Sequence, residues 1–186
     1  MSNRAYLEIF YHNEKRIAGR GSDHLFHFMH LVYVELVKME LMRDGTCVDA
    51  IDGSAFDQAL QWIDSRNDCA DFIIPALIRI LREHRNTPRL DEKYAQKMED
   101  ALIRFKYWLD EPGEVHACYF TENHQVLFHS AEYLAGQLYP DRVFISNGQT
   151  GAWHKEHATV FLRRWIDWRK RFGFSEWLAQ GYYAED

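Results

Sequence analysis

Apolar residues recur every three or four positions through most of this 186-residue chain, a spacing typical of amphipathic α-helices. In residues 23–42, for example, Phe26, Met29, Tyr33 and Leu36 follow it. The same pattern predicts helices over residues 56–64, 71–84, 91–109, 122–138 and 154–172, with a last helix beginning near residue 175. The breakers "RDG", "DEPGE" and "SNGQTG" separate these segments. Only residues 6–11, "YLEIFY", favour a β-strand.

A short motif, Trp-(Ile/Leu)-Asp, ends three of the predicted helices, at residues 62–64, 108–110 and 165–167. After each motif, a short loop leads to a segment with a polar start: "RNDCAD", "FTENHQ" and "FSEWLA". Recurrence at roughly 50 residues is the size of a helical hairpin with its connections. We therefore predict an all-α fold of antiparallel helical hairpins, stacked as an open solenoid or closed as an α/α toroid. In a toroid the polar helix starts converge on one mouth.

The composition excludes several classes of protein. Lys and Arg total 22 against 28 Asp and Glu, and no basic block stands on one face, so a nucleic-acid partner is not expected. No run of about 18 apolar residues occurs, so no membrane span is expected. The three cysteines lack the spacing of a disulfide framework or a zinc site, and the N-terminus is not a secretory signal. We predict a cytoplasmic protein with one helical domain, residues 1–186, in which residues 1–22 extend the hairpins of residues 23–186.

The stretch "FTENHQ" is the strongest candidate for a functional site, because Glu122, Asn123, His124 and Gln125 stand side by side before an apolar helix. Helix capping is the alternative explanation. Thr121 is an expected N-cap, and an acidic first turn favours the positive end of the helix dipole. The same two explanations apply to Ser175 and Glu176 in "FSEWLA". Capping alone does not require Asn, His and Gln in succession.

Several longer stretches carry a resemblance to a known group of proteins. "FKYWLDEPGE", "CYFTENHQVLFHSAEYLAGQLYPD" and "RFGFSEW" followed by "YYAED" resemble a microbial and fungal family of α/α-toroid proteins, over roughly residues 66–186. That group is similar to six-hairpin glycosidases and to heparinase- or alginate-type polysaccharide lyases. The resemblance implies a partial α/α toroid, further hairpins beyond residue 186, and a polysaccharide or oligosaccharide substrate. It also leaves room for a homo-oligomer that completes the core.

Two reactions are consistent with this resemblance. In a uronate lyase, Asn123 and His124 would neutralise the uronate carboxylate, while Tyr182 or Tyr183 would transfer protons. In a glycosidase, Glu122 and Glu176 would act as the carboxylate pair, with Asp110 as a substitute. A non-catalytic helical scaffold is the third alternative.

Aromatic and polar residues near these clusters are candidates for substrate binding. Trp108, Trp177 and Tyr183 offer rings that stack on sugars, and Asp110, Gln125 and His129 offer polar contacts. His129 is otherwise expected to be a core histidine that Glu132 orients. The run of residues 169–171, "RKR", is expected to favour the helix dipole, with acidic glycan binding as the alternative. No cofactor and no metal site are predicted, since histidines three apart at residues 24, 27 and 30 drift around a helix and no HExxH motif is present.

Overall fold

The computed structural model describes residues 3–20, 27–46, 48–114 and 116–176. These residues form seven α-helices and one short 3-10 helix, η1 (Ala70–Phe72), with no β-strand among them. The predicted all-α class is therefore confirmed for the described part of the chain. The chain divides into two compact units: residues 1–65 with 72–101, and residues 66–71 with 102–186.

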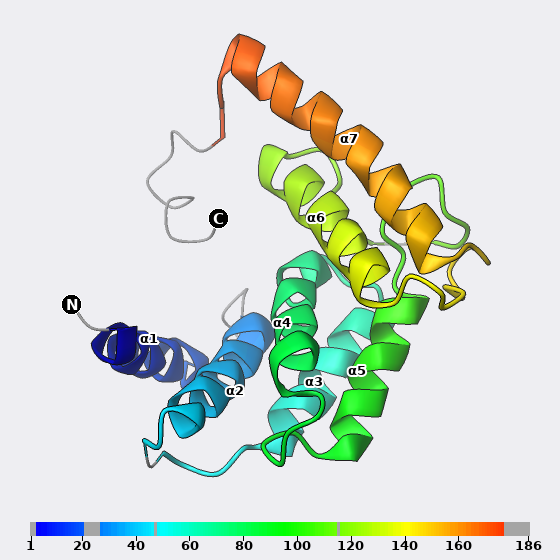
Figure 1. Cartoon of the computed structure of the whole chain (residues 1–186). Helices are drawn as coiled ribbons and strands as arrows, with labels where there is room; N and C mark the ends of the chain where they lie inside the picture. The colour runs from blue at the N-terminus through cyan, green and yellow to red at the C-terminus, as the bar shows by residue number, and fades with distance from the viewer. Residues whose placement is uncertain (1–2, 21–26, 47, 115, 177–186) are drawn as a thin grey trace. The chain divides into compact units, whose positions relative to one another are not determined.

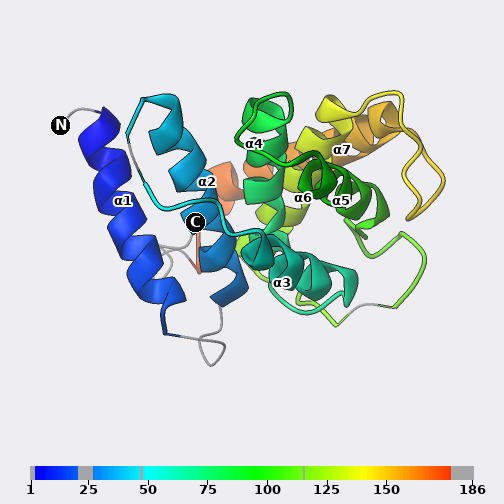
Figure 2. The same ribbon diagram turned by 90° about the horizontal axis from the view of Figure 1, so that it is seen from below.

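The first unit contains α1 (Asn3–Ala18), α2 (His27–Arg43), α3 (Gly53–Asp64), α4 (Ile74–His84) and most of α5 (Glu92–Arg104). Helices α1 and α2 lie side by side as an antiparallel pair (Figures 1 and 2). Tyr11 of α1 packs against Val34 and Leu41 of α2, and the Glu14 carboxylate lies 2.6 Å from the Nδ1 atom of His30. A helical hairpin therefore includes α1, which lies within residues 1–22, the part predicted as an extension of the hairpins.

The predicted strand at residues 6–11 is wrong, because these residues lie inside α1. Leu7, Phe10 and Tyr11 pack on α2 and follow the helical spacing of three and four. Tyr6 is 58% exposed, so the stretch is apolar on one helical face rather than on alternate residues. Packing against α2 therefore explains the aromatic residues that suggested a strand.

Helix α2 carries the ionisable side chains Glu35 and Lys38 into the interior of the first unit. Lys38 donates to the Glu35 carboxylate at 2.7 Å and to the carbonyl of Ala50 at 3.0 Å. The second Glu35 oxygen accepts the backbone N–H of Asp52 at 2.8 Å, just before α3 begins. Burial raises the pKa of Glu35, although these donors act in the opposite direction. Both oxygens of the Glu35 carboxylate accept hydrogen bonds, one from Lys38 and one from the backbone of Asp52, so Glu35 links α2 to the start of α3.

The second unit is built on α6 (Glu122–Leu138) and α7 (Gly151–Phe172), an antiparallel hairpin (Figure 1). Gly136 and Gly151 let the two helices approach closely at the loop end. A Cβ atom on Gly136 would collide with the carbonyl of Gly151 and lie 2.8 Å from the backbone nitrogen of Lys155. The predicted bounds of α6 are confirmed, and Gly173, at φ 74°, ends α7 as expected.

Two of the three predicted Trp-(Ile/Leu)-Asp helix ends are wrong. Helix α5 ends at Arg104, before Trp108, and the motif at residues 165–167 lies inside α7. A side chain explains the early end of α5: Glu111 Oε1 accepts the backbone N–H groups of Tyr107 at 3.0 Å and Trp108 at 3.2 Å. Those N–H groups therefore do not continue the helical hydrogen-bond ladder. Only the motif at residues 62–64 closes a helix, α3.

The core of the second unit is aromatic. Tyr107, Phe128 and Phe144 are at most 1% exposed, and the Tyr107 hydroxyl donates to the Leu102 carbonyl at 2.9 Å. Phe105 stacks on Phe128 with 5.9 Å between ring centroids.

No helix in the described residues combines the length and the apolar character needed to cross a membrane.

Candidate functional site

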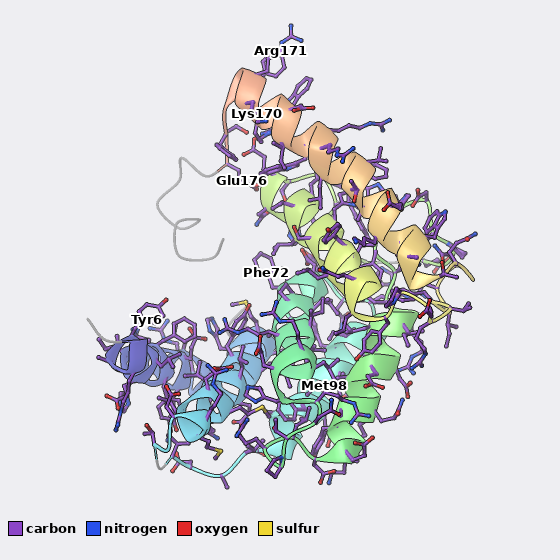
Figure 3. The ribbon with its side chains drawn as sticks, in the orientation of Figure 1. Tyr6, Phe72, Met98, Lys170, Arg171 and Glu176 are labelled. Atoms are coloured by element: carbon purple, nitrogen blue, oxygen red, sulfur yellow. The ribbon has the colours of Figure 1, made fainter. Side chains whose placement is uncertain are left out.

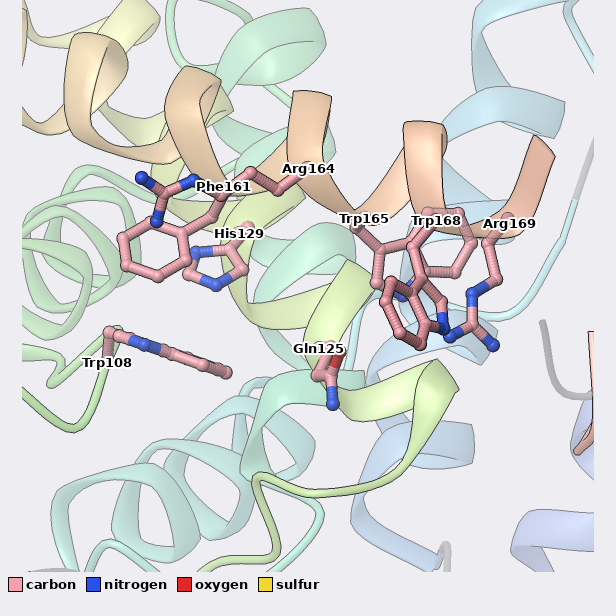
Figure 4. Close-up of a pocket in the computed structure, with 8 residues that line it drawn as sticks. All are labelled: Trp108, Gln125, His129, Phe161, Arg164, Trp165, Trp168 and Arg169. Carbon is pink, nitrogen blue, oxygen red and sulfur yellow. The ribbon is translucent and has the colours of Figure 1, made fainter. Parts of the chain in front are cut away.

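A pocket of about 370 Å³ opens in the second unit beside α6 and α7 (Figure 4). Most of its lining residues come from one face of α7, at the spacing i, i+3, i+4, i+7 and i+8. The lining residues are Trp108, Gln125, His129, Phe161, Arg164, Trp165, Trp168 and Arg169. The wall is therefore aromatic, with cationic groups from α7.

His129 lies between two aromatic rings in this wall. Its imidazole stacks on Phe161 with a centroid distance of 4.4 Å, and Trp108 lies 4.1 Å away on a tilted plane. Figure 4 shows the three side chains together at one end of the pocket, with Gln125 between them and the Trp165–Trp168 end. Because His129 is only 2% exposed, its ring is held rigidly.

Two arginines contribute positive charge at opposite ends of the pocket. The Arg164 guanidinium lies 5.9 Å from the centre of Phe161 and, among the described residues, has no carboxylate partner. The Arg169 guanidinium lies 5.8 Å from the Trp165 ring and forms an ion pair with Glu122. The charge of Arg164 is therefore the one available to an anionic ligand.

Behind His129 lies Glu132, a fully buried carboxylate surrounded by histidines. The Oε2 atom of Glu132 is 3.5 Å from His129 Nδ1, while Oε1 lies 2.9 Å from His154 Nδ1 and 2.8 Å from His157 Nδ1. Burial would raise the pKa of Glu132, but the hydrogen bonds from the three histidines and the charge of His157 outweigh it and lower the pKa. The carboxylate is therefore held ionised, facing the imidazole that lines the pocket.

The predicted substrate-binding residue Asp110 is bound to this network instead of lining the pocket. Its carboxylate lies 2.9 Å from His157 Nε2. Burial would lower the pKa of His157, but the charges of Glu132 and Asp110 and its hydrogen bonds to them raise it. Asp110 therefore stabilises a protonated His157.

The segments predicted as helix starts at residues 122 and 175 do meet, and the carboxylate of each accepts backbone N–H groups of the other. The Glu122 carboxylate accepts the N–H groups of Ser175 at 3.0 Å and Glu176 at 3.1 Å, and the Ser175 hydroxyl at 2.7 Å. In return, the Glu176 carboxylate accepts the N–H of Asn123 at 3.0 Å, and Figure 3 shows Glu176 beside the first turn of α6. Both carboxylates therefore accept hydrogen bonds from backbone N–H groups, and that of Glu122 also pairs with Arg169.

Asn123 and His124 also have structural partners. Asn123 Oδ1 accepts the Thr121 hydroxyl at 2.5 Å and the N–H of His124 at 2.7 Å. Thr121 stands at the N-cap position but its side chain makes no capping hydrogen bond, so that part of the capping expectation is wrong. The carboxylate of Glu176 takes the role of the cap.

His124 is oriented by a buried carboxylate. Its Nδ1 atom lies 2.6 Å from Asp71 Oδ2, and Asp71 is fully buried with its Oδ1 atom lacking a hydrogen-bond partner. Burial alone would lower the pKa of His124, but the hydrogen bond and charge of Asp71, with the charges of Asp68 and Glu176, raise it. Burial also raises the pKa of Asp71. Asp68 and Cys69 each place a donor atom within 4.8 Å of a His124 nitrogen.

Apart from Asp110, which contacts His157, the predicted site residues within the described part of the chain fall into two groups. Trp108, Gln125 and His129 share the pocket, whereas the predicted catalytic residues 122–124 and 176 form the neighbouring helix-capping cluster. The other predicted residues, Trp177, Tyr182 and Tyr183, lie outside the described part of the chain.

Sequence reasoning missed most of the α7 side of the pocket. The sequence pattern predicts a helix over residues 154–172 but assigns no binding role to Phe161, Arg164, Trp165 or Trp168. The interleaving of arginine with aromatic residues at helical spacing in "FLRRWIDWR" was the available signal.

The chain was compared with protein-family models, curated proteins and solved structures, and no match was found in any of the three.

Proposed function

We propose that this protein is a carbohydrate-active protein whose pocket binds an acidic sugar unit, a uronate, and supports lyase chemistry on it. The observation that carries the proposal is the place of His129, an imidazole backed by an ionised carboxylate. It lines a pocket that also holds Arg164, an arginine without a carboxylate partner among the described residues. The partial α/α toroid implied by the sequence resemblance remains part of this proposal.

The pocket wall suits a sugar ring that bears a negative charge. Tryptophan rings such as Trp168, which is 56% exposed, present flat apolar faces to the C–H groups of a pyranose. Arg164 can pair with a carboxylate in a bidentate manner, and its position on the Phe161 ring fixes its direction. Because Arg164 is exposed, an anionic ligand would gain an ion pair with it that a neutral ligand would not, so the pocket favours an anion.

His129 is the residue we assign to proton transfer. In a uronate lyase, the base removes the proton at C5, the electron pair forms the C4–C5 double bond, and the C4–O bond breaks. His129 Nε2 would accept the proton, with Glu132 holding the imidazole through Nδ1. Arg164 would neutralise the carboxylate and so stabilise the developing negative charge. A water molecule or Tyr182 would return a proton to the leaving oxygen.

The glycosidase alternative receives less support from the geometry. It assigns the chemistry to Glu122 and Glu176, whose carboxylates accept backbone N–H groups from each other's segments. A general acid must give a proton to the leaving oxygen, and the Arg169 ion pair favours the ionised form of Glu122. We therefore assign these two glutamates to helix capping.

The test is a lyase assay on a panel of uronate polymers, read by the ultraviolet absorbance of the unsaturated uronate product. We expect His129→Asn to lower the rate by about 10²–10⁴-fold, the usual size of a general acid–base contribution. The exposed histidine His116 offers a matched control, and His116→Asn should leave the rate unchanged.

Three outcomes would separate the alternatives. A flat absorbance trace on every polymer would overturn the lyase assignment. Release of reducing ends without the absorbance change would point to hydrolysis. Binding without turnover would identify a non-catalytic glycan-binding scaffold.

A further inference from the structure

The interior of the second unit holds a group of buried carboxylates and imidazoles, of which the proposed sugar chemistry uses only Glu132, as the carboxylate that orients His129. Glu111, Glu132 and His154 are 4%, 0% and 0% exposed, and each offers one ligand atom within 4.8 Å of the other two. They come from three different parts of the chain, the loop after α5, helix α6 and helix α7.

The hydrogen bonds in this group leave several buried atoms without partners. Glu111 uses Oε1 to accept the N–H groups of Tyr107 and Trp108, while its Oε2 atom has no hydrogen-bond partner. The Oε2 atom of Glu132 also lacks one. Leaving a buried polar atom unpaired is unfavourable, and more so for a charged group.

The two oxygens without a well-formed hydrogen bond each face one side chain outside the group. His129 Nδ1 lies 3.5 Å from Glu132 Oε2, and the Ser146 hydroxyl faces the Glu111 carboxylate. Among the described residues, neither contact meets the geometry of a hydrogen bond. Each of the two carboxylates therefore keeps a buried oxygen that an ion could bind.

We propose that Glu111, Glu132 and His154 form a buried binding site for one divalent transition-metal ion of the Mn²⁺, Fe²⁺, Co²⁺ and Zn²⁺ group. Two carboxylates carry the charge that balances a divalent ion, and carboxylate with imidazole suits these metals. Bonds of about 2.0–2.2 Å place opposing ligand atoms up to about 4.4 Å apart, so side-chain shifts of a few tenths of an ångström close the site.

The hydrogen bonds around His154 supply the orientation that a metal-binding imidazole needs. Its Nε2 atom lies 3.0 Å from Asn147 Oδ1, and Asn147 Oδ1 in turn accepts the N–H of Gln149 at 3.0 Å. A ring nitrogen held in this way fixes the imidazole, as in many metal sites. Nδ1 of the same ring faces Glu132 at 2.9 Å and would turn to the ion. Because all three ligands are buried, we expect the ion to stabilise the fold.

The test is isothermal titration of the metal-stripped protein with Mn²⁺, Co²⁺ and Zn²⁺ chlorides, with Co²⁺ absorption to report on the ligands. We expect one ion per chain, a higher melting temperature, and Co²⁺ bands typical of nitrogen and oxygen ligands. Glu111→Gln keeps the Oε1 acceptor but removes one negative ligand, so it should weaken binding by at least about tenfold. Glu156→Gln, at an exposed glutamate of α7, is the control and should bind normally.

The proposal is overturned if the wild-type protein binds none of these ions stoichiometrically, which would identify the group as a hydrogen-bonded polar core only. It is also overturned if Glu111→Gln binds as tightly as the wild type. If Glu111→Gln does not fold, the Co²⁺ spectrum of the wild type decides, because absence of a nitrogen ligand contradicts the role of His154. None of these readouts depends on sugar binding, so this proposal and the uronate proposal can fail separately.

Discussion

Glu122 and Glu176, 54 residues apart, hold each other's backbone. The Glu122 carboxylate accepts the N–H of Glu176 at 3.1 Å, and the Glu176 carboxylate accepts the N–H of Asn123, next to Glu122, at 3.0 Å. This reciprocal arrangement fixes the segment after α7 against the first turn of α6. A carboxylate at a helix N-terminus is favoured by both hydrogen bonding and the helix dipole.

We expect the two glutamates to be thermodynamically coupled. Glu122→Ala should lower the free energy of unfolding by about 1–3 kcal/mol, because it leaves part-buried N–H groups without an acceptor. In the double variant with Glu176→Ala, the combined loss should differ from the sum of the single losses by about 0.5–3 kcal/mol. Urea denaturation, followed by tryptophan fluorescence, measures both quantities. Strict additivity would mean that the two caps act independently.

Because α6 and α7 approach closely at Gly136, we expect Gly136→Ala to change the free energy of unfolding in the direction opposite to that usual for Gly→Ala in a helix. Gly→Ala inside a helix normally stabilises by about 1 kcal/mol. Gly136→Ala should instead destabilise by about 1–3 kcal/mol, because the new Cβ meets the backbone of α7 rather than a flexible side chain. Thermal unfolding checks this. The control is Gln137→Ala, an exposed neighbour on the same helix, which should change stability by no more than about 0.5 kcal/mol.

The Asp71–His124 pair predicts a pH dependence of stability. The pKa of His124 is raised in the folded state. The stabilisation of the fold by protonated His124 is therefore fully present below pH 6.5, the ordinary pKa of histidine. It is lost as the pH rises through the raised pKa. The free energy of unfolding should therefore fall above pH 6.5 by more in the wild type than in His124→Asn. Urea denaturation over a pH series measures the difference, and His116→Asn should keep the wild-type slope.

Removing only the carboxylate of the same pair should be costly. Asp71→Asn leaves a buried imidazole without its charged partner, and breaking such a pair costs about 3–5 kcal/mol. A melting temperature close to that of the wild type would show that the pair contributes little.

Local sequence patterns predicted the helices well where packing and capping agreed with them. The bounds of α6 follow from the polar start "TENHQ" and from Tyr139–Pro140, and both are visible in the sequence. Trp108, Gln125 and His129 were identified as binding candidates, and they share one pocket. These residues could be found because aromatic and polar side chains beside a helix start are unusual in a core.

Long-range contacts determined what local patterns could not show. Helix α5 was expected to reach residue 109, but Glu111 takes the backbone donors that its last turn would need. The local pattern of residues 6–11 favoured a strand. It could not show that Leu7 and Tyr11 pack on helix α2, which begins about twenty residues later. The repeat at roughly 50 residues predicted that the segments starting near residues 122 and 175 meet, but it did not predict that the Glu176 carboxylate accepts the N–H of Asn123.

The pocket itself gives the last prediction. Arg164→Gln removes the one pocket cation without a carboxylate partner among the described residues, so it should weaken binding of an acidic sugar by about tenfold or more. It should leave binding of a neutral sugar of equal length nearly unchanged. The matched control is Arg163→Gln, at an exposed arginine of α7 that does not line the pocket.

Isothermal titration of the wild-type protein with a uronate oligosaccharide, and with its neutral, carboxyl-reduced counterpart, tests most directly whether the pocket binds an acidic sugar. We expect saturable binding of the acidic sugar at one site per chain, with much weaker binding of the neutral sugar. We also expect loss of that preference in Arg164→Gln. Equal affinity for the two sugars, or no binding of either, would contradict the proposal.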